Sequence, residues 1–211
     1  MAAAFQGSLL DGDDEVGLRA LGPAIRRTTL SAGAWLDLRP GWLTGADELF
    51  GRLARDVPWH GERRQMYDRE VEVPRLLSFY DEDDRLPDPV LTQARSALSD
   101  HYEPELGEPF RTAGLCLYRD GRDSVAWHGD TIGRASTEDT MVAIISVGTP
   151  RALLLRPRGG GAGRTLRYVL GHGDLVVMGG SCQRTWEHAI PKTARPVGPR
   201  ISIQLRPRGV R

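Results

Sequence analysis

The order of apolar and polar residues predicts two amphipathic helices in the first half of the chain. The first follows Thr44, which forms a capping-box pattern with Asp47 three residues later. The second begins at Asp88, a typical N-cap residue, with Pro89 at the first helical position. The apolar residues at helical spacing, which would face a core, are Leu49, Phe50, Leu53, Leu91, Ala94 and Leu98.

The second half of the chain consists of short β-rich runs that are separated by Gly and Pro. The predicted strands cover residues 114–119, 141–147, 152–156, 165–170, 174–178 and 200–206, and the glycine-rich residues 159–163 predict a hairpin loop. Many short strands without helices between them favour a sandwich or jelly roll over a parallel α/β sheet. We therefore predict an α+β fold, mainly β, with N-terminal helices packed on a β core.

Length and composition indicate one globular domain. We expect residues 1–22 to be a flexible segment and residues 23–211 to form a single domain. No run of 18 apolar residues and no signal sequence is present, so we expect a cytoplasmic protein with no membrane partner. The two cysteines, Cys116 and Cys182, make no disulfide framework and agree with a reducing compartment. The 28 basic and 28 acidic residues give zero net charge, which argues against tight nonspecific binding to nucleic acid but allows a local basic groove.

A His-x-Asp pair at His128 and Asp130 indicates metal chemistry. Residues two apart on a strand point to the same face, so both side chains could reach one ion. With a second histidine they would make the facial triad of non-haem Fe(II) oxygenases, although the pair alone also fits a solvated strand end. The candidate for the second histidine is His188, just past a β run. The competing histidines, which we expect to be exposed, are His60, His101 and His172.

The last predicted strand, residues 200–206, alternates fully between apolar and polar side chains. Its polar face carries Arg200, Ser202, Gln204 and Arg206. An edge strand with one wet face would have the same pattern. If the polar face instead lies inside a small barrel, the two arginines could bind a dicarboxylate such as 2-oxoglutarate through bidentate, charge-assisted contacts.

Together these segments resemble the AlkB family of alkylated-base demethylases. The resemblance covers residues 66–206 and rests on segments in the family's order, which are Val73 to Tyr80, Leu117 to Asp130, Gly171 to Met178, Trp186 to Lys192 and Arg200 to Arg206. Several ordered motifs at these spacings are far more specific than any one of them.

The resemblance implies a double-stranded β-helix that holds Fe(II) at His128, Asp130 and His188. It also implies that Tyr118 and Arg200 bind the distal carboxylate of the cosubstrate 2-oxoglutarate, with Ser202 and Arg206 completing that pocket. With O2 as the second cosubstrate, such an enzyme hydroxylates an N-linked methyl group, and the product releases formaldehyde. The implied partner is DNA or RNA with alkylated bases, and we expect a monomer.

Two departures from the family pattern bear on the substrate. Cys116 stands where the family has Asn, and Ile132 stands where the family commonly has an acidic residue that helps to recognise a cationic base. We place nucleotide recognition in residues 60–85, where arginines lie among aromatic residues. The predicted substrate-binding residues are Met66, Tyr67, Arg75, Tyr80, Trp127 and Ile132.

Two rival functions remain at this level. The first is a hydroxylase of a small molecule or a protein on the same iron site, which Ile132 and the neutral net charge favour. The second is a jelly-roll binding module without activity, which the presence of both histidines, Asp130 and Arg200 opposes.

Overall fold

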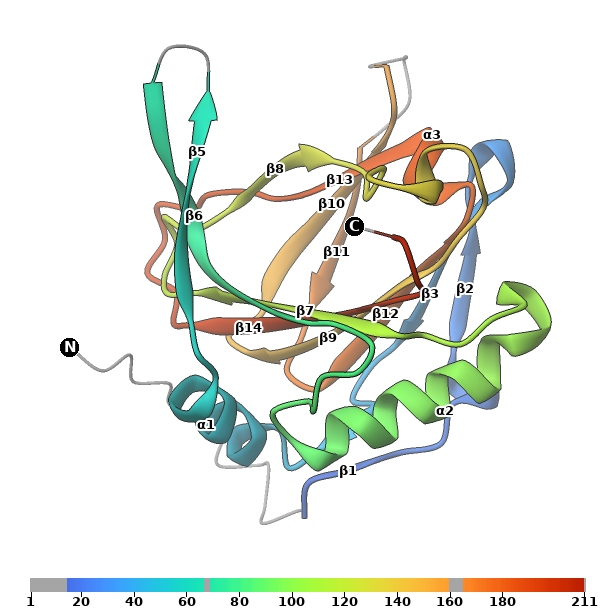
Figure 1. The fold of residues 1–211 in the computed structure, drawn as a ribbon, viewed down its shortest axis with the longest axis horizontal. Coiled ribbons are helices and arrows are strands. Elements are labelled where there is room, and N and C mark those ends of the chain that lie inside the picture. Colours follow the sequence, from blue (N-terminus) through green and yellow to red (C-terminus); the bar gives the residue numbers. More distant parts are fainter. Residues whose placement is uncertain (1–14, 67–68, 160–164, 211) are drawn as a thin grey trace.

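The computed structural model describes residues 15–66, 69–159 and 165–210, with the backbone alone at 64–66 and 69–72. Within this part of the chain two antiparallel sheets face each other (Figure 1). The larger sheet has the order β2 (Arg26–Thr29), β3 (Ala34–Arg39), β12 (Asp174–Gly180), β9 (Val142–Gly148), β14 (Arg200–Arg206), β7 (Thr112–Tyr118), β6 (Arg69–Tyr80) and β5 (His60–Met66). The smaller sheet has the order β11 (Leu166–Leu170), β10 (Arg151–Pro157), β13 (Trp186–Ile190) and β8 (Val125–His128).

From β7 onward the chain passes back and forth between the two sheets. Strands β7, β9, β12 and β14 lie in the larger sheet, and strands β8, β10, β11 and β13 lie in the smaller one. This winding makes the core a jelly roll, which confirms the predicted mainly β fold class. All the strands predicted in the second half of the chain are present, with small shifts at their ends.

Helices α1 (Ala46–Asp56) and α2 (Pro89–Leu106) cover the outer face of the larger sheet (Figure 1). Their buried residues form one cluster with the outward side chains of that sheet, and the list includes Leu49, Phe50, Leu53, Leu91, Ala94 and Leu98, as predicted. A second apolar cluster fills the space between the two sheets and includes Leu36, Leu155, Val176 and Met178. The shorter elements are β1 (Gly17–Leu18), β4 (Leu43–Thr44), α3 (Cys182–Thr185) and 3-10 turns at Gly22–Ala24, Ser31–Gly33 and Arg134–Ser136.

The start of α1 differs from the predicted capping box. The N-cap residue is Gly45, whose φ of 58° lies in the left-handed region, and no side chain caps the helix there. The Thr44 hydroxyl instead donates to the carbonyl of Glu15 at 2.8 Å. Asp47 pairs with His172, so Thr44 and Asp47 each hold a neighbouring segment.

The predicted flexible segment, residues 1–22, lies mostly outside the described residues. From Glu15 on, however, the segment is structured, because β1 pairs with β4 and the backbone N–H of Arg19 donates to the carbonyl of Trp42 at 2.8 Å. The predicted glycine loop at 159–163 falls between β10 and β11, which pair as expected, but residues 160–164 are not described. Among the described helices, none is long and apolar enough to cross a membrane.

Candidate active site

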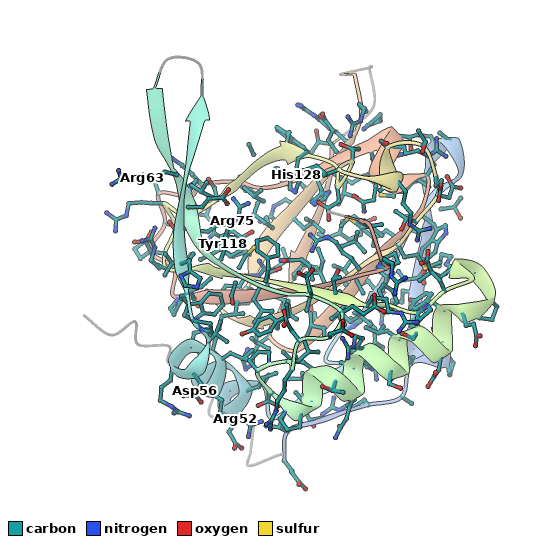
Figure 2. The ribbon with its side chains drawn as sticks, in the orientation of Figure 1. Arg52, Asp56, Arg63, Arg75, Tyr118 and His128 are labelled. Atoms are coloured by element: carbon teal, nitrogen blue, oxygen red, sulfur yellow. The ribbon has the colours of Figure 1, made fainter. Side chains whose placement is uncertain are left out.

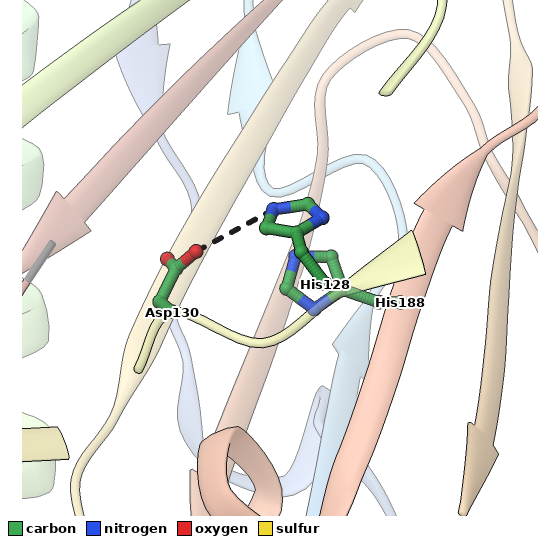
Figure 3. Close-up of side chains that lie close together, drawn as sticks. All are labelled: His128, Asp130 and His188. Carbon is green, nitrogen blue, oxygen red and sulfur yellow. Dashed lines mark ion pairs between the residues drawn. The ribbon is translucent and has the colours of Figure 1, made fainter. Parts of the chain in front are cut away.

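His128, Asp130 and His188 come together at one end of the smaller sheet (Figure 3). His128 is the last residue of β8, and His188 is its cross-strand partner on β13, with 4.2 Å between the ring centroids. One ligand atom from each of the three residues lies within 4.8 Å of the other two. His128 Nε2 is 3.5 Å from Asp130 Oδ1. The arrangement offers two imidazoles and one carboxylate on one side of an ion.

Asp130 reaches this point by a turn rather than by strand alternation, because β8 ends at His128. A β-carbon on Gly129 would lie 2.3 Å from the carbonyl oxygen of Gln183, so only glycine fits in the turn. The side-chain oxygen of Gln183 then accepts a hydrogen bond from the Asp130 backbone N–H at 3.0 Å. The predicted convergence of His128 and Asp130 is therefore present, but for a different local reason.

The charges around the three residues favour the states that bind a metal. Burial opposes ionisation of Asp130, but the combined effects of Arg206, His188 and His128 outweigh it, and the pKa of this carboxyl falls to about 2. Arg206 Nε donates to Asp130 Oδ2 at 2.8 Å. Burial lowers the pKa of His188 to about 3, which keeps its imidazole neutral. His128 Nδ1 lies 2.8 Å from the carbonyl oxygen of Ala126 and so carries the proton, which leaves Nε2 free as a ligand.

These donors fit Fe(II). Neutral imidazole nitrogens and a carboxylate are the ligands of the two-histidine, one-carboxylate site, and the arrangement leaves positions open for other ligands. His60 and His101 are exposed, as expected. His172 is not, because Nδ1 accepts a hydrogen bond from the backbone N–H of Gly148 at 2.7 Å and Nε2 lies 3.0 Å from Asp47 Oδ1. Its expected exposure is wrong, since the turn packs against α1.

Arg200 and Tyr118 lie opposite each other on β14 and β7, inside the space between the sheets. Arg200 is 1% exposed, and its Nε donates to Ser146 Oγ at 2.8 Å. Its terminal nitrogens, Nη1 and Nη2, are buried with no hydrogen-bond partner among the described residues. Burial lowers the pKa of Arg200 and raises the pKa of Tyr118 to about 12, so the Tyr118 hydroxyl keeps its proton. A buried guanidinium with two open nitrogens beside a phenol fits a carboxylate ligand.

The other predicted cosubstrate residues have partners of their own. Ser202 Oγ accepts a hydrogen bond from Gln204 Nε2 at 2.6 Å, and Arg206 binds Asp130. Gln204 also accepts a weak hydrogen bond from the Cys116 thiol, at 3.7 Å between Sγ and Oε1. Gln204 was not among the predicted site residues, although the alternation of residues 200–206 put it on the same face.

Of the predicted substrate residues, Arg75 lies on the site face of β6. Its Nη1 donates to the carbonyl of Ser124 at 3.2 Å, and Arg75 and Tyr118 both lie on the side of the sheet that faces the site (Figure 2). Ile132 is 67% exposed. Tyr67 lies outside the described residues, and the side chain of Met66 is not described.

The structure does not bring Tyr80 and Trp127 to the site. Tyr80 packs with Leu76 against the helix-covered cluster, on the face of β6 opposite to Leu77. Trp127 precedes His128 on β8 and so points to the other side of the sheet. There its ring stacks under Arg156, 4.2 Å from the guanidinium carbon, and Arg156 pairs with Glu187 at 2.9 Å.

A family profile described as the 2OG-Fe(II) oxygenase superfamily matches residues 44–206. The chain belongs to this superfamily. The bovine (Bos taurus) alpha-ketoglutarate-dependent dioxygenase alkB homolog 3 is 32% identical over 188 residues, which cover 80% of this chain and 64% of the relative. The human (Homo sapiens) DNA oxidative demethylase ALKBH2 is 26% identical over 184 residues, covering 76% of this chain and 68% of the relative. The chain thus spans less than two thirds of the length of the bovine relative, and it resembles the AlkB homologues within a superfamily whose metal is Fe(II) and whose cosubstrates are 2-oxoglutarate and O2.

Solved structures agree with the fold. A prolyl hydroxylase from Trichoplax adhaerens, solved with a hypoxia inducible factor peptide, aligns with a TM-score of 0.57 at 10% identity. The alignment covers 81% of this chain and 83% of the hydroxylase. At this identity the likeness concerns the jelly roll and not the substrate.

Proposed function

We propose that this dioxygenase repairs alkylated nucleic acid by oxidative demethylation of N-methylated bases, with release of formaldehyde. The observation that carries the proposal is the AlkB-like sequence, at 32% identity to an alkB homolog and 26% identity to a DNA oxidative demethylase. It is joined here to a complete set of candidate iron ligands at His128, Asp130 and His188. The proposal covers both DNA and RNA as candidate substrates.

The chain's own residues have separate tasks in this reaction. Bound Fe(II) and 2-oxoglutarate supply the oxidising chemistry, in which O2 oxidises 2-oxoglutarate to succinate and CO2 and one oxygen atom enters the methyl C–H bond. His128, Asp130 and His188 would hold the iron, and Arg206 keeps Asp130 ionised. Arg200 would hold the distal carboxylate, with Tyr118 beside it as a hydrogen-bond donor. The hydroxymethyl product then loses formaldehyde and returns the N–H base.

The β5–β6 hairpin is the proposed nucleic-acid contact. It extends beyond the body of the larger sheet, beside the start of β8 (Figure 1), where the Ser124 backbone N–H donates to the carbonyl of Pro74 at 2.8 Å. Four arginines occur between Arg63 and Arg75 in its sequence, and Arg63 is exposed. Arginine suits phosphate contacts, which position a nucleic acid without reading its sequence. The hairpin sequence also contains four acidic residues, so the proposed contact rests on individual arginines and not on a net positive charge of the hairpin; the acidic residues are Glu62, Asp68, Glu70 and Glu72.

The second candidate function is hydroxylation of a small molecule or a protein on the same iron site. The exposed, apolar Ile132 favours it, because no carboxylate is available at that position to pair with a cationic methylated base. The two functions differ in their product: demethylation releases formaldehyde from an oligonucleotide, whereas hydroxylation of another substrate leaves the oligonucleotide unchanged.

The test measures formaldehyde and succinate together on oligonucleotides that carry 1-methyladenine, 3-methylcytosine, 1-methylguanine or 3-methylthymine. The expected result is formaldehyde in step with succinate on at least one base, and none with a His188→Ala variant. Succinate production with no formaldehyde from any of the four bases would reject nucleic-acid repair and favour the hydroxylase.

A further inference from the structure

Phe79 is the most exposed of the large apolar side chains in the described part of the chain, at 69%. It lies on β6 on the same face as Leu77, which belongs to the cluster between the two sheets, so Phe79 points toward the site and not toward the helices. An open aromatic ring at the edge of an active site is a surface that a planar ligand can cover.

Gly114 leaves room beside Phe79 that a larger residue would fill. Phe79 is paired with Gly114 on β7, and Gly114 is paired with Gln204 on β14. A β-carbon on Gly114 would lie 3.0 Å from Arg206 Nη1 and 3.2 Å from both Gln204 Oε1 and Phe79 Cε1. An aromatic ring, an amide and a guanidinium therefore converge over the bare backbone of Gly114. Because Arg206 also binds Asp130, this point adjoins the candidate iron site.

The amide of Gln204 has only one orientation that satisfies its neighbours. One end lies 2.6 Å from Ser202 Oγ and 3.3 Å from the Ser202 carbonyl oxygen. A carbonyl oxygen can only accept, so the Gln204 nitrogen must occupy that end. The Gln204 oxygen then faces Cys116 and Gly114, where its partner is the weak thiol donor. It is a fixed acceptor that can take a stronger N–H donor.

We propose that Phe79 and Gln204 form the platform that binds the substrate base, with the Phe79 ring stacked on the base and Gln204 Oε1 accepting from an N–H or amino group of that base. The proposal rests on the proposed function and gives its substrate class a physical form: a planar heterocycle with a hydrogen-bond donor on its edge. Neither residue was among the predicted substrate residues, where Tyr80 stood in place of Phe79.

The direct test measures binding without turnover. Wild type and variants, loaded with Mn(II) and 2-oxoglutarate without O2, are titrated against a fluorescent oligonucleotide with one methylated base and against the same oligonucleotide with an abasic site. Wild type should bind the methylated oligonucleotide about 10-fold more tightly, which is the scale of one stacked base. Phe79→Ala should remove most of that difference, and Phe79→Trp should keep it. The affinity for 2-oxoglutarate should not change in either variant.

Val169→Ala is the matched control, because Val169 is also an exposed apolar residue, at 49%, but lies on the edge strand β11. The Val169→Ala variant should prefer the methylated over the abasic oligonucleotide as strongly as wild type does. Gln204→Leu should weaken binding of an oligonucleotide whose methylated base carries an amino group, such as 3-methylcytosine. It should have a smaller effect on binding of one with 3-methylthymine, which has no N–H on the ring.

The outcomes separate the platform from the chemistry. If Phe79→Ala still releases formaldehyde and still prefers the methylated over the abasic oligonucleotide as strongly as wild type, the proposed platform is wrong and demethylation stands. A Phe79-dependent preference for the intact base without any formaldehyde would support the platform and reject demethylation. Equal loss of affinity for both oligonucleotides in Phe79→Ala would mean a general effect on the fold and would overturn the stacking role.

Discussion

Replacement of Arg200 by Met should change stability and cosubstrate binding in opposite directions. The Arg200 side chain is buried between the sheets, where its Nε donates to Ser146 Oγ at 2.8 Å. Its two terminal nitrogens have no partner among the described residues, and burial lowers its pKa. Without cosubstrate, the chain therefore carries a buried positive charge that is poorly compensated.

The magnitudes follow from that arrangement. Removing one partner of a buried ion pair costs about 3–5 kcal/mol, so Arg200→Met should weaken 2-oxoglutarate binding by roughly 10²- to 10⁴-fold. In the cosubstrate-free protein the substitution removes an unpaired charge and loses one hydrogen bond worth about 1 kcal/mol. Met fills a similar volume with an unbranched apolar chain, so the free protein should be as stable as wild type or about 1 kcal/mol more stable.

The assay is unfolding of Mn(II)-loaded protein with and without 2-oxoglutarate, together with calorimetric binding. A ligand at 100 times its Kd stabilises a protein by about 2.7 kcal/mol, and wild type should gain that amount. Arg200→Met should gain almost none at the same concentration. Arg156→Met serves as the control, because Arg156 is a partly exposed arginine on the outer face of the smaller sheet and pairs with Glu187.

Two results would refute this reasoning. Wild-type affinity for 2-oxoglutarate in Arg200→Met would remove Arg200 from the cosubstrate pocket. A loss of several kcal/mol in the stability of the free variant would mean that the guanidinium is a structural group with partners of its own, and not a side chain held ready for a carboxylate.

Further predictions concern the metal ligands, His172 and Ile132. His188→Ala should weaken Co(II) binding at least 100-fold by spectroscopic titration, whereas the exposed-histidine variant His101→Ala should bind as wild type does. In metal-free protein the pKa of His188 is lowered to about 3, so below pH 6.5 the unfolded chain binds a proton that the folded chain does not. Stability should therefore fall from pH 6.5 to pH 3 by at most about 1.4 kcal/mol per pH unit, and urea unfolding of His188→Gln should show a shallower slope. His172→Ala should cost about 1–3 kcal/mol in the same unfolding assay, because the Gly148 N–H loses its acceptor; no change would mean that water replaces the imidazole. Ile132→Asp should raise turnover of 1-methyladenine relative to 1-methylguanine by up to about tenfold, and an unchanged ratio would place residue 132 away from the base.

The sequence predicted the strands of the second half of the chain and the convergence of the metal ligands, but it did not predict β5 and β6, and it assigned Tyr80 and not Phe79 to the substrate. Apolar alternation along residues 200–206 needs no partner to be recognised, and both of its faces are buried in the structure. In β6, Phe79 and Tyr80 are adjacent aromatics, and a shift of one residue in register exchanges their faces. Only the pairing of Phe79 with Gly114 decides which of them faces the site. The helix start at Gly45 was missed for a related reason, because a left-handed glycine cap has no side-chain signal.

The substitution of Cys116 for the family Asn is accompanied by a polar group on the neighbouring strand. Cys116 lies opposite Ser202, and Gln204, two residues further along β14, reaches back to both of them. Its nitrogen donates to Ser202 and its oxygen accepts from the Cys116 thiol, so the polar contact that Cys116 cannot make is available from an amide anchored on β14. Burying a thiol next to an amide costs little free energy, whereas a buried Asn without a partner at that place would leave polar atoms unsatisfied. The departure at residue 116 and the long side chain at residue 204 are therefore best understood together, as one rearranged wall of the pocket between Arg200 and Arg206.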